Sequence, residues 1–205
     1  MKITLEKISK RFNYDKIFTD INFIFISGES YAVIGPNGSG KSTLLKILSG
    51  NLTPSSGKIY FELGGKMIPL ENIYKHVSYA APYLELIEEF TLDEIINFHF
   101  KLKNFLPGIE IQKFKDIIHL PAQQKKQLKY FSSGMKQRVK LALAVLSDAQ
   151  IILLDEPTTN LDAASVDWYL SIIQKYTADK LLFIGSNLER EYTFCNKILD
   201  IVAYK

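Results

Sequence analysis

One glycine-rich run constrains the fold of this chain more than any other segment. Residues 35–42 read Gly-Pro-Asn-Gly-Ser-Gly-Lys-Ser, after an apolar run at 31–34 and before residues with helical spacing at 43–48. A strand, a glycine-rich loop and a helix in this order form a phosphate cradle, because backbone N–H groups and the helix dipole point at the phosphate oxygens. The Gly-Lys-Ser spacing is the specific part of the motif. The alternative is a glycine-rich turn that binds no ligand.

The residues of this loop have distinct expected roles. Lys41 is expected to reach the terminal phosphates of a nucleotide, and Ser42 is expected to bind a magnesium ion. The predicted phosphate-binding residues are Gly35, Pro36, Asn37, Gly38, Ser39, Gly40, Lys41, Ser42 and Thr43.

A second element supplies two carboxylates. Residues 151–154 are all apolar and are followed by Asp155 and Glu156. Such a run is typical of a strand buried in a parallel sheet, so the carboxylates would emerge at its tip, beside the phosphates. Asp155 is predicted to hold magnesium through water, and Glu156 to polarise the attacking water as the general base. A strand that ends in charged residues is a weak signal alone. Together with the phosphate-binding loop at 35–42, the P-loop, it predicts an ATPase.

A third run connects the chain to a family. Residues 131–138 read Phe-Ser-Ser-Gly-Met-Lys-Gln-Arg and precede an apolar helical stretch. The run resembles the signature sequence of ABC ATPases, Leu-Ser-Gly-Gly-Gln: Ser132 and Gly134 match, whereas positions 131, 133 and 135 differ. Residues 159–162, which end in Asp162, look like the D-loop of that family. Phe12 lies where its adenine-stacking aromatic residue usually falls.

This resemblance implies a fold and a set of ligands. The fold class is α/β: a P-loop NTPase of ABC type, with a mixed-sheet ATP-binding core and an inserted helical subdomain. The implied cofactors are ATP and Mg²⁺. The chain is expected to be a single domain, 1–205, in which 1–81 and 139–205 form the core and about 82–138 form the helical subdomain that ends in the signature.

The signature also implies a partner. In the family, two ATPase domains face each other head to tail, and the N-terminus of each signature helix caps the γ-phosphate held by the other P-loop. Ser132, Ser133 and the Gly134 N–H would therefore act in trans on a second copy or a homologous subunit. Without the resemblance, Ser-Ser-Gly before a helix is more simply an N-cap.

Two positions depart from the family pattern. The alignment through residues 77–79 places Pro82 where the family has a Gln at the exit from the core. Asn187 stands where it has a His near the γ-phosphate, and an Asn can donate a hydrogen bond there but cannot change charge near neutral pH. Asn187 is therefore the third predicted catalytic residue, with Glu156 and Lys41, and hydrolysis is expected to be slow.

Local patterns predict the remaining elements. Strands are expected over about 1–34, at 58–61, 77–79 and 181–184. Thr91 and Glu94 form a capping-box pattern, which predicts a helix start. Helical spacing continues to residue 102, is broken at 106–108 and resumes over 111–118, and one more helix is expected after Asp162.

Composition excludes several classes of protein. The net charge of +3 is small and scattered, which argues against nucleic acid as a partner, and the single cysteine, Cys195, excludes an internal disulfide. We see no signal peptide, and the apolar runs are far shorter than the roughly 18–20 residues that span a bilayer.

The resemblance therefore implies an ATP-hydrolysing subunit that powers transport, with export expected, through a separate membrane subunit. It would lie in the cytoplasm, at the inner face of the membrane through that partner. Family members receive a short helix of the membrane subunit at the junction of core and helical subdomain, where this chain has Tyr83, Leu84, Leu86, Phe90 and Ile95. At least Tyr83 and Phe90 are expected to be partly exposed and to form a docking groove; the alternative is that most of these side chains are subdomain core. The rival functions are a non-transport ABC ATPase, such as a ribosome-acting or DNA-repair protein, and a weakly hydrolysing ATP-gated scaffold. Ribosome-acting members usually carry two such domains in one chain. DNA-repair members carry a long coiled coil between the P-loop and the signature, where this chain has no sustained heptads.

Overall fold

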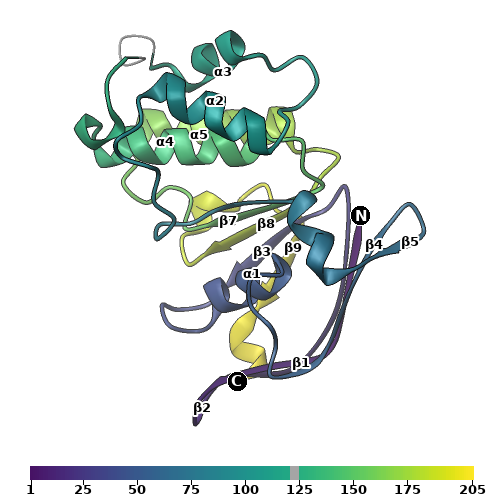
Figure 1. Ribbon diagram of the computed structural model, residues 1–205. Helices are drawn as coiled ribbons and strands as arrows, with labels where there is room; N and C mark the ends of the chain where they lie inside the picture. Colours follow the sequence, from purple (N-terminus) through teal and green to yellow (C-terminus); the bar gives the residue numbers. More distant parts are fainter. Residues whose placement is uncertain (121–124) are drawn as a thin grey trace. The chain divides into compact units, whose positions relative to one another are not determined.

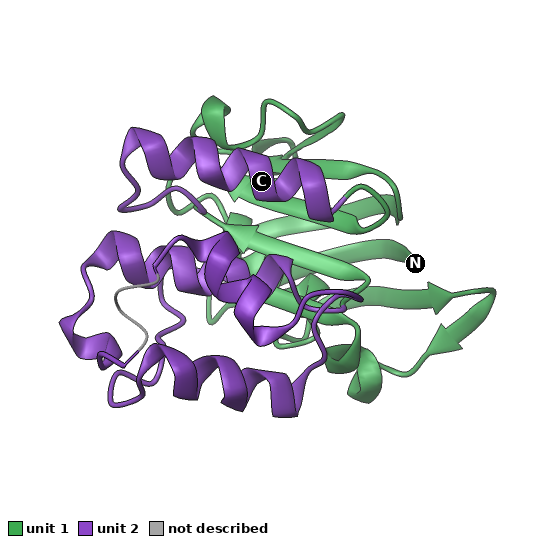
Figure 2. Ribbon diagram, turned by 90° about the horizontal axis from the view of Figure 1, so that it is seen from above, with its two compact units in different colours: residues 1–79, 149–156, 178–205 green, residues 80–148, 157–177 purple. Residues whose placement is uncertain are grey.

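The computed structural model describes residues 1–120 and 125–205, and it divides into two compact units. Unit 1 comprises residues 1–79, 149–156 and 178–205, and unit 2 comprises residues 80–148 and 157–177 (Figure 2). Within the described ranges, no helix is both long enough and apolar enough to cross a membrane.

Unit 1 is built on two sheets (Figure 1). The first has the order β2-β1-β4-β5 and is antiparallel; its strands are β1 (Lys2–Phe12), β2 (Asp15–Ile26), β4 (Ser56–Leu63) and β5 (Lys66–Ile68). The second has the order β6-β7-β8-β3-β9, with β3 (Ser30–Ile34), β6 (Val77–Ala80), β7 (Ile151–Asp155), β8 (Leu181–Ser186) and β9 (Lys197–Asp200). Helix α1 (Lys41–Leu48) and the short 3₁₀ segments η1 (Leu70–Lys75), η4 (Glu189–Glu191) and η5 (Ile201–Tyr204) complete the unit.

The pattern of apolar residues in each strand matches the faces of the strand that are buried. In β1, Ile3 and Leu5 are buried on one face, and a bulge at Lys7, whose φ is 51°, lets Ile8 continue the buried row. Every residue of β7 is buried, and β7 pairs in parallel with β8. A parallel strand covered on both faces needs such a continuous apolar run, so this prediction is confirmed.

Unit 2 contains the four longer helices that follow β6. They are α2 (Leu92–Leu102), α3 (Ile111–Ile118), α4 (Ser133–Val145) and α5 (Ala163–Tyr176), with the 3₁₀ segment η3 (Leu128–Tyr130). The predicted capping box is present: Glu94 N–H donates to Thr91 Oγ1, and Thr91 N–H donates to Glu94 Oε2. Helix α3 packs on α4, and α4 packs on α5.

The two units divide the chain differently from the predicted core (1–81 and 139–205) and helical subdomain (82–138). Residues 139–148 and 157–177 fall in unit 2, because α4 runs without a break through position 139 and packs on α5. The assignment of the units to an ATP-binding core and a helical subdomain remains a prediction. Residues 121–124 of the predicted subdomain lie outside the described residues.

Candidate functional site

The second sheet of unit 1 gathers three predicted elements at one edge. Strands β7, β8 and β3 are parallel neighbours, with Asp155 opposite Gly185 and Ile34 opposite Ser186. Their C-terminal ends therefore share one edge of the sheet. The P-loop follows β3, Asp155 and Glu156 end β7, and Asn187 follows β8. Crevices at such an edge are where α/β proteins bind ligands.

The P-loop conformation requires glycine at two positions. Gly35 has a φ of 146°, and a Cβ on it would lie 2.6 Å from Ser39 Oγ. Gly40, with a φ of 111°, caps the N-terminus of α1, and a Cβ on it would lie 2.6 Å from Ile17 Cγ2. Both positions combine a left-handed backbone with a close neighbour, which only glycine accommodates. The loop is thereby held in a tight turn at a helix N-terminus, as a phosphate cradle requires.

Lys41 is folded against this loop. Its Nζ donates to the carbonyl oxygens of Gly35 (2.9 Å) and Pro36 (3.2 Å), and the residue is almost fully buried. A buried ammonium needs such acceptors, because burying an unpaired charge is costly. Lys41 therefore holds positive charge at the mouth of the cradle, and Ser39 Oγ is buried beside it without a partner among the described residues.

Asp155 is a buried carboxyl with one unsatisfied oxygen. Only 2% of the residue is exposed, and its Oδ1 has no hydrogen-bond partner among the described residues. Burial raises the pKa of Asp155 above its usual value, although the Ser42 hydroxyl and the Lys41 charge oppose this shift. Tyr79 lies beside the carboxyl, and burial together with the Asp155 charge raises the pKa of its hydroxyl. A cation next to Asp155 would favour the charged carboxylate and so lower the pKa of this group.

The donor set fits magnesium. The Ser42 hydroxyl and the orphaned Asp155 Oδ1 are oxygen ligands, which Mg²⁺ prefers, and Mg²⁺ is usually held by one or two protein groups together with substrate phosphates. In the described part of the chain, no group of three or more His, Cys, Asp or Glu side chains is placed to hold a metal.

Glu156 has a strained backbone. Its φ of 44° lies in the left-handed region, and its N–H donates to the Gly185 carbonyl oxygen at 2.8 Å. A non-glycine residue in this region costs free energy and is found preferentially at functional sites. The turn ends β7, so that the Glu156 side chain, unlike that of Asp155, is only partly buried.

The other two predicted nucleotide contacts lie at the surface of unit 1. Asn187 is exposed directly after β8. Phe12 ends β1 with 46% of its surface exposed, and Lys10 Nζ lies 4.9 Å from its ring centroid. Next to it is a hollow of about 510 Å³. Its lining residues include Lys10, Arg11, Lys16 and Phe18. Phe18 also approaches Gly40, since a Cβ there would lie 3.2 Å from the Phe18 ring.

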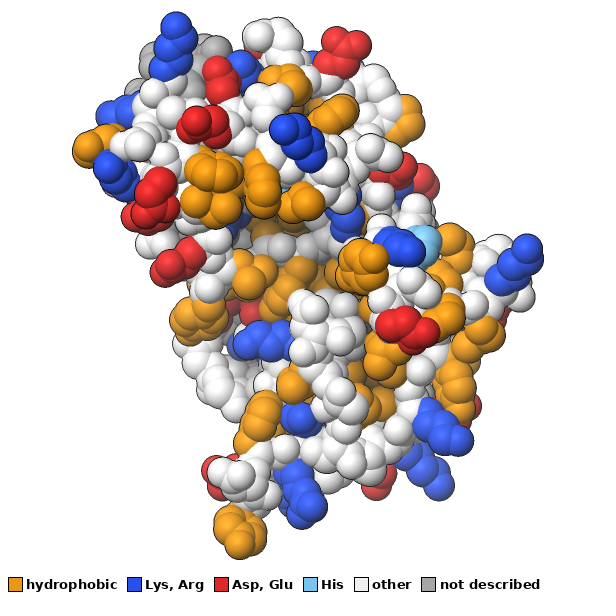
Figure 3. Space-filling view, viewed as in Figure 1, with side chains coloured by type: hydrophobic (Ala, Val, Ile, Leu, Met, Phe, Trp, Pro, Cys, Tyr) orange, Lys and Arg blue, Asp and Glu red, His pale blue; other side chains and the backbone are white. Residues whose placement is uncertain are grey.

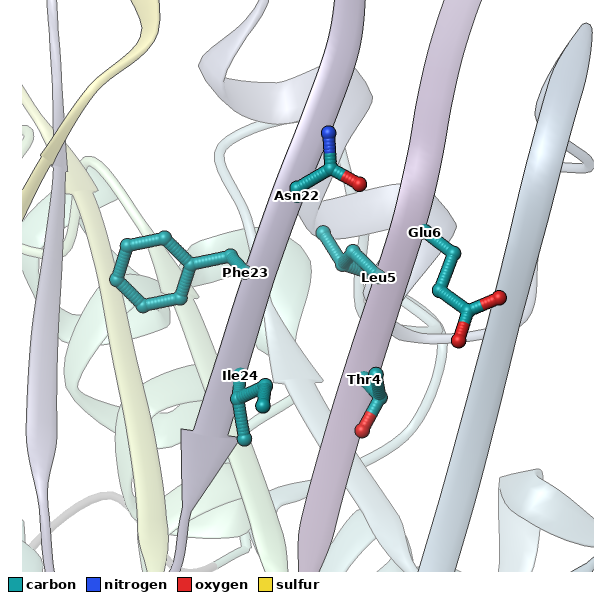
Figure 4. Close-up of a pocket in the computed structure, with 6 residues that line it drawn as sticks. All are labelled: Thr4, Leu5, Glu6, Asn22, Phe23 and Ile24. Carbon is teal, nitrogen blue, oxygen red and sulfur yellow. The ribbon is translucent and has the colours of Figure 1, made fainter.

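A second hollow of about 590 Å³ lies on β1 and β2 (Figure 4). It is lined by Thr4, Leu5, Glu6, Asn22, Phe23 and Ile24. None of these is a predicted site residue.

Unit 2 carries the signature at the N-terminus of α4. Ser132 is the N-cap, and its Oγ accepts a hydrogen bond from Met135 N–H at 3.2 Å. The capping alternative is thus present, and the Ser132 hydroxyl proton remains available for a further acceptor. Ser133 beside it is exposed. A Cβ on Gly134 would lie 2.9 Å from the Asn160 carbonyl oxygen, so a glycine is required here by close packing.

The D-loop packs on the signature helix within the same unit. Asp162 is the N-cap of α5 and accepts a hydrogen bond from Ser165 N–H at 2.8 Å. Hydrogen bonds from the Ser165 hydroxyl and from the Ser165 N–H, with a smaller contribution from Arg138, lower the pKa of Asp162. Gln137 Nε2 donates to the Pro157 carbonyl oxygen at 2.8 Å.

Sequence reasoning missed two residues around Asp155. Tyr79 is a strand residue without any motif, and its position beside Asp155 follows from the pairing of β6 with β7. Gly185 interrupts an apolar strand, and a Cβ on it would lie 3.0 Å from Asp155 Oδ1 and 2.8 Å from Leu45 Cδ1. An isolated glycine in a strand often marks such a close approach, so this signal was present in the sequence.

Comparisons with known proteins show which family this chain resembles. The sequence pattern of the ABC transporter family matches residues 18–159. The cytochrome c biogenesis ATP-binding export protein CcmA of Rhizobium meliloti is 34% identical over 80% of this chain and 80% of its own length. An uncharacterized ABC transporter ATP-binding protein, YcbN of Bacillus subtilis, is 29% identical over 88% of this chain, which spans 60% of YcbN. The structure of an ATP-binding ABC protein of Pyrococcus furiosus superposes with a TM-score of 0.84 at 22% identity, and all of both chains is covered.

Proposed function

Because this chain belongs to the ABC transporter family, we propose that it is an ATP-binding subunit that hydrolyses ATP to drive a separate membrane protein. One observation carries the proposal: the P-loop, the carboxylates of Asp155 and Glu156, and Asn187 follow three neighbouring strands at one sheet edge. This arrangement supports a site in which a phosphate cradle, a metal-binding carboxylate and a general base act together.

The residues divide the chemistry of phosphoryl transfer between them. The amides of residues 35–43 and the N-terminus of α1 bind the phosphates, and Lys41 pairs with the terminal ones. The Glu156 carboxylate orients a water molecule and accepts its proton while the water oxygen bonds to the γ-phosphorus. The bond from that phosphorus to the β–γ bridging oxygen breaks, and ADP is the leaving group. Mg²⁺, held by Asp155 and Ser42, would supply positive charge to the phosphates.

A second copy or a homologous subunit completes the site. The exposed Ser132 and Ser133 at the start of α4 are hydroxyl donors at the positive end of a helix dipole, which suits a phosphate bound by another chain. Asp162, on the D-loop, packs in the same unit as these serines.

The membrane partner would dock on the segment that follows β6. Tyr83 is 85% exposed, Leu84 is also exposed, and Leu86 and Phe90 are half-buried. Ile95 is buried in α2 and is therefore a core residue, as the alternative for this set of side chains has it. Figure 3 shows hydrophobic side chains exposed among charged ones on the visible face. This partner would hold the chain at the inner face of the membrane, and the likeness to CcmA supports export as the direction.

A titration of ATP with Mg²⁺, followed by calorimetry, tests the proposal. We expect Lys41→Ala to abolish measurable ATP binding, because it removes the buried cation of the cradle. Lys46→Ala, an exposed lysine later on α1, is the matched control and should bind ATP within a few-fold of wild type. Equal affinity in Lys41→Ala and wild type would contradict the proposal.

A weakly hydrolysing, ATP-gated scaffold is the second candidate, and the residues Asn187 and Pro82 favour it. It predicts tight ATP binding with turnover that stays very slow at every protein concentration.

A further inference from the structure

We infer that Lys136 and Lys140 form a clamp that couples displacement of residues 81–90, the docking segment, to the signature at the start of α4. Lys140 is the principal positioning residue of this clamp. The inference rests on the proposed function, in which residues 81–90 are the docking segment. All the contacts that carry it lie within unit 2.

The two lysines lie one turn apart on α4, so both face the same side of the helix. Lys136 Nζ forms an ion pair with Glu88 Oε1. Lys140 Nζ donates to the carbonyl oxygens of Ala81 (3.4 Å) and Pro82 (3.3 Å). The clamp therefore holds the docking segment near both of its ends.

The clamp acts on a segment with few regular hydrogen bonds of its own. Within it, Leu84 N–H donates to the Ala81 carbonyl oxygen at 3.2 Å, the same oxygen that Lys140 binds. Its far end is tied to the residues before the signature, since Leu128 N–H donates to Phe90 O and Lys129 N–H donates to Glu88 O. Lysine side chains and these two backbone bonds thus link the docking segment to α4 and its N-terminal approach.

The surroundings of Lys140 suit it to hold the docking segment in place. It is half-buried, and burial lowers the pKa of its ammonium group while Glu85 opposes the shift. A half-buried cation depends on its acceptors, so a displacement of the Ala81–Pro82 peptide is resisted by the lysine and therefore by the helix that carries it. Pro82 offers no side-chain amide for such a link. Here the link instead runs from α4 to the backbone of Pro82.

Hydrogen exchange of the full chain, followed by mass spectrometry, tests this clamp. In wild type above its dimerisation concentration, Mg-ATP should slow exchange at residues 131–136 and also in the docking segment. In Lys140→Met, the change at 131–136 should persist while the change in the docking segment is lost. Without nucleotide, exchange in the docking segment should be about tenfold faster than in wild type, as expected for the loss of a hydrogen bond to a charged group.

Three further variants separate a positioning role from a structural one. Lys140→Arg can donate to the same carbonyls and should restore the response. Glu88→Gln, at an exposed position, should weaken the response without affecting folding. Lys113→Met, an exposed lysine on α3 outside the clamp, should behave as wild type.

The outcomes are distinguishable. An ATP response of the docking segment in Lys140→Met equal to that of wild type would overturn the inference alone. A wild-type chain that binds no ATP in calorimetry would overturn the proposed function, and the inference with it.

Discussion

Gly185→Ala should damage both the core of unit 1 and its proposed magnesium site. The added methyl group would lie 2.8 Å from Leu45 Cδ1 and 3.0 Å from Asp155 Oδ1, closer than ordinary contacts of this kind. Leu45 and Gly185 are both buried, so neither can move freely. Overpacking of this kind costs about 1–3 kcal/mol of unfolding free energy. In a chain of 205 residues each kcal/mol lowers Tm by about 2–4 °C.

The same methyl group should displace the carboxyl of Asp155. We therefore expect weaker binding of Mg-ATP, whereas binding of ATP in the presence of EDTA should change little. Denaturant unfolding gives the stability change, and calorimetry with and without Mg²⁺ gives the metal-dependent part of the affinity.

A double variant separates the two contacts. Leu45→Val removes the clashing Cδ1, so Gly185→Ala should cost less in that background than in wild type. The loss of Mg²⁺ dependence should remain, because Leu45→Val leaves the contact between the added methyl group and Asp155 in place. If Gly185→Ala were within about 0.5 kcal/mol of wild type, with an unchanged Mg²⁺ dependence, the reasoning from close packing would be wrong.

Two further predictions concern turnover and pH. Asn187→His should raise kcat up to about tenfold while ATP affinity stays within a few-fold, and Pro82→Gln alone should do less. An unchanged or lower steady-state rate in Asn187→His would show that Asn187 does not occupy the position of the family's His near the γ-phosphate, or that the site is built around the amide. Burial lowers the pKa of His99 to about 4, with Lys103 adding to the shift. In the unfolded chain His99 is protonated below about pH 6.5, whereas in the folded chain it stays neutral down to about pH 4. The free energy of unfolding should therefore fall by up to ~3 kcal/mol as the pH drops from about 6.5 to 4. Denaturant unfolding of wild type and His99→Gln at several pH values checks this, and parallel curves for the two proteins would contradict it.

Sequence reasoning succeeded where the physics is local. The P-loop and the capping box at Thr91 each satisfy backbone groups with neighbouring residues, so their patterns can be read directly. The buried strand β7 was indicated by its continuous apolar run. Ser132 caps α4, as the simpler interpretation expected, and its role toward a second subunit stays a prediction.

Sequence reasoning failed for elements and residues whose position depends on pairing with segments far away in the sequence. Strands β5 and β9 are short and lie at sheet edges, and they are defined by partners far away in sequence. Tyr79 and Lys140 carry no motif, because their roles come from the elements packed beside them. The two compact units likewise depend on the packing of α4 on α5, and the predicted division into an ATP-binding core and a helical subdomain stays a prediction.

The most direct test of the account is ATP hydrolysis and association by Glu156→Gln. The substitution keeps the shape of the side chain but removes the proposed general base, and the loss of a general base typically costs ~10² to 10⁴ in rate. With Mg-ATP, we predict that the variant forms a long-lived dimer in size exclusion with light scattering and that its turnover falls by this factor. If Glu156→Gln instead hydrolysed ATP at the wild-type rate, the assignment of the base and of the site at this sheet edge would be contradicted.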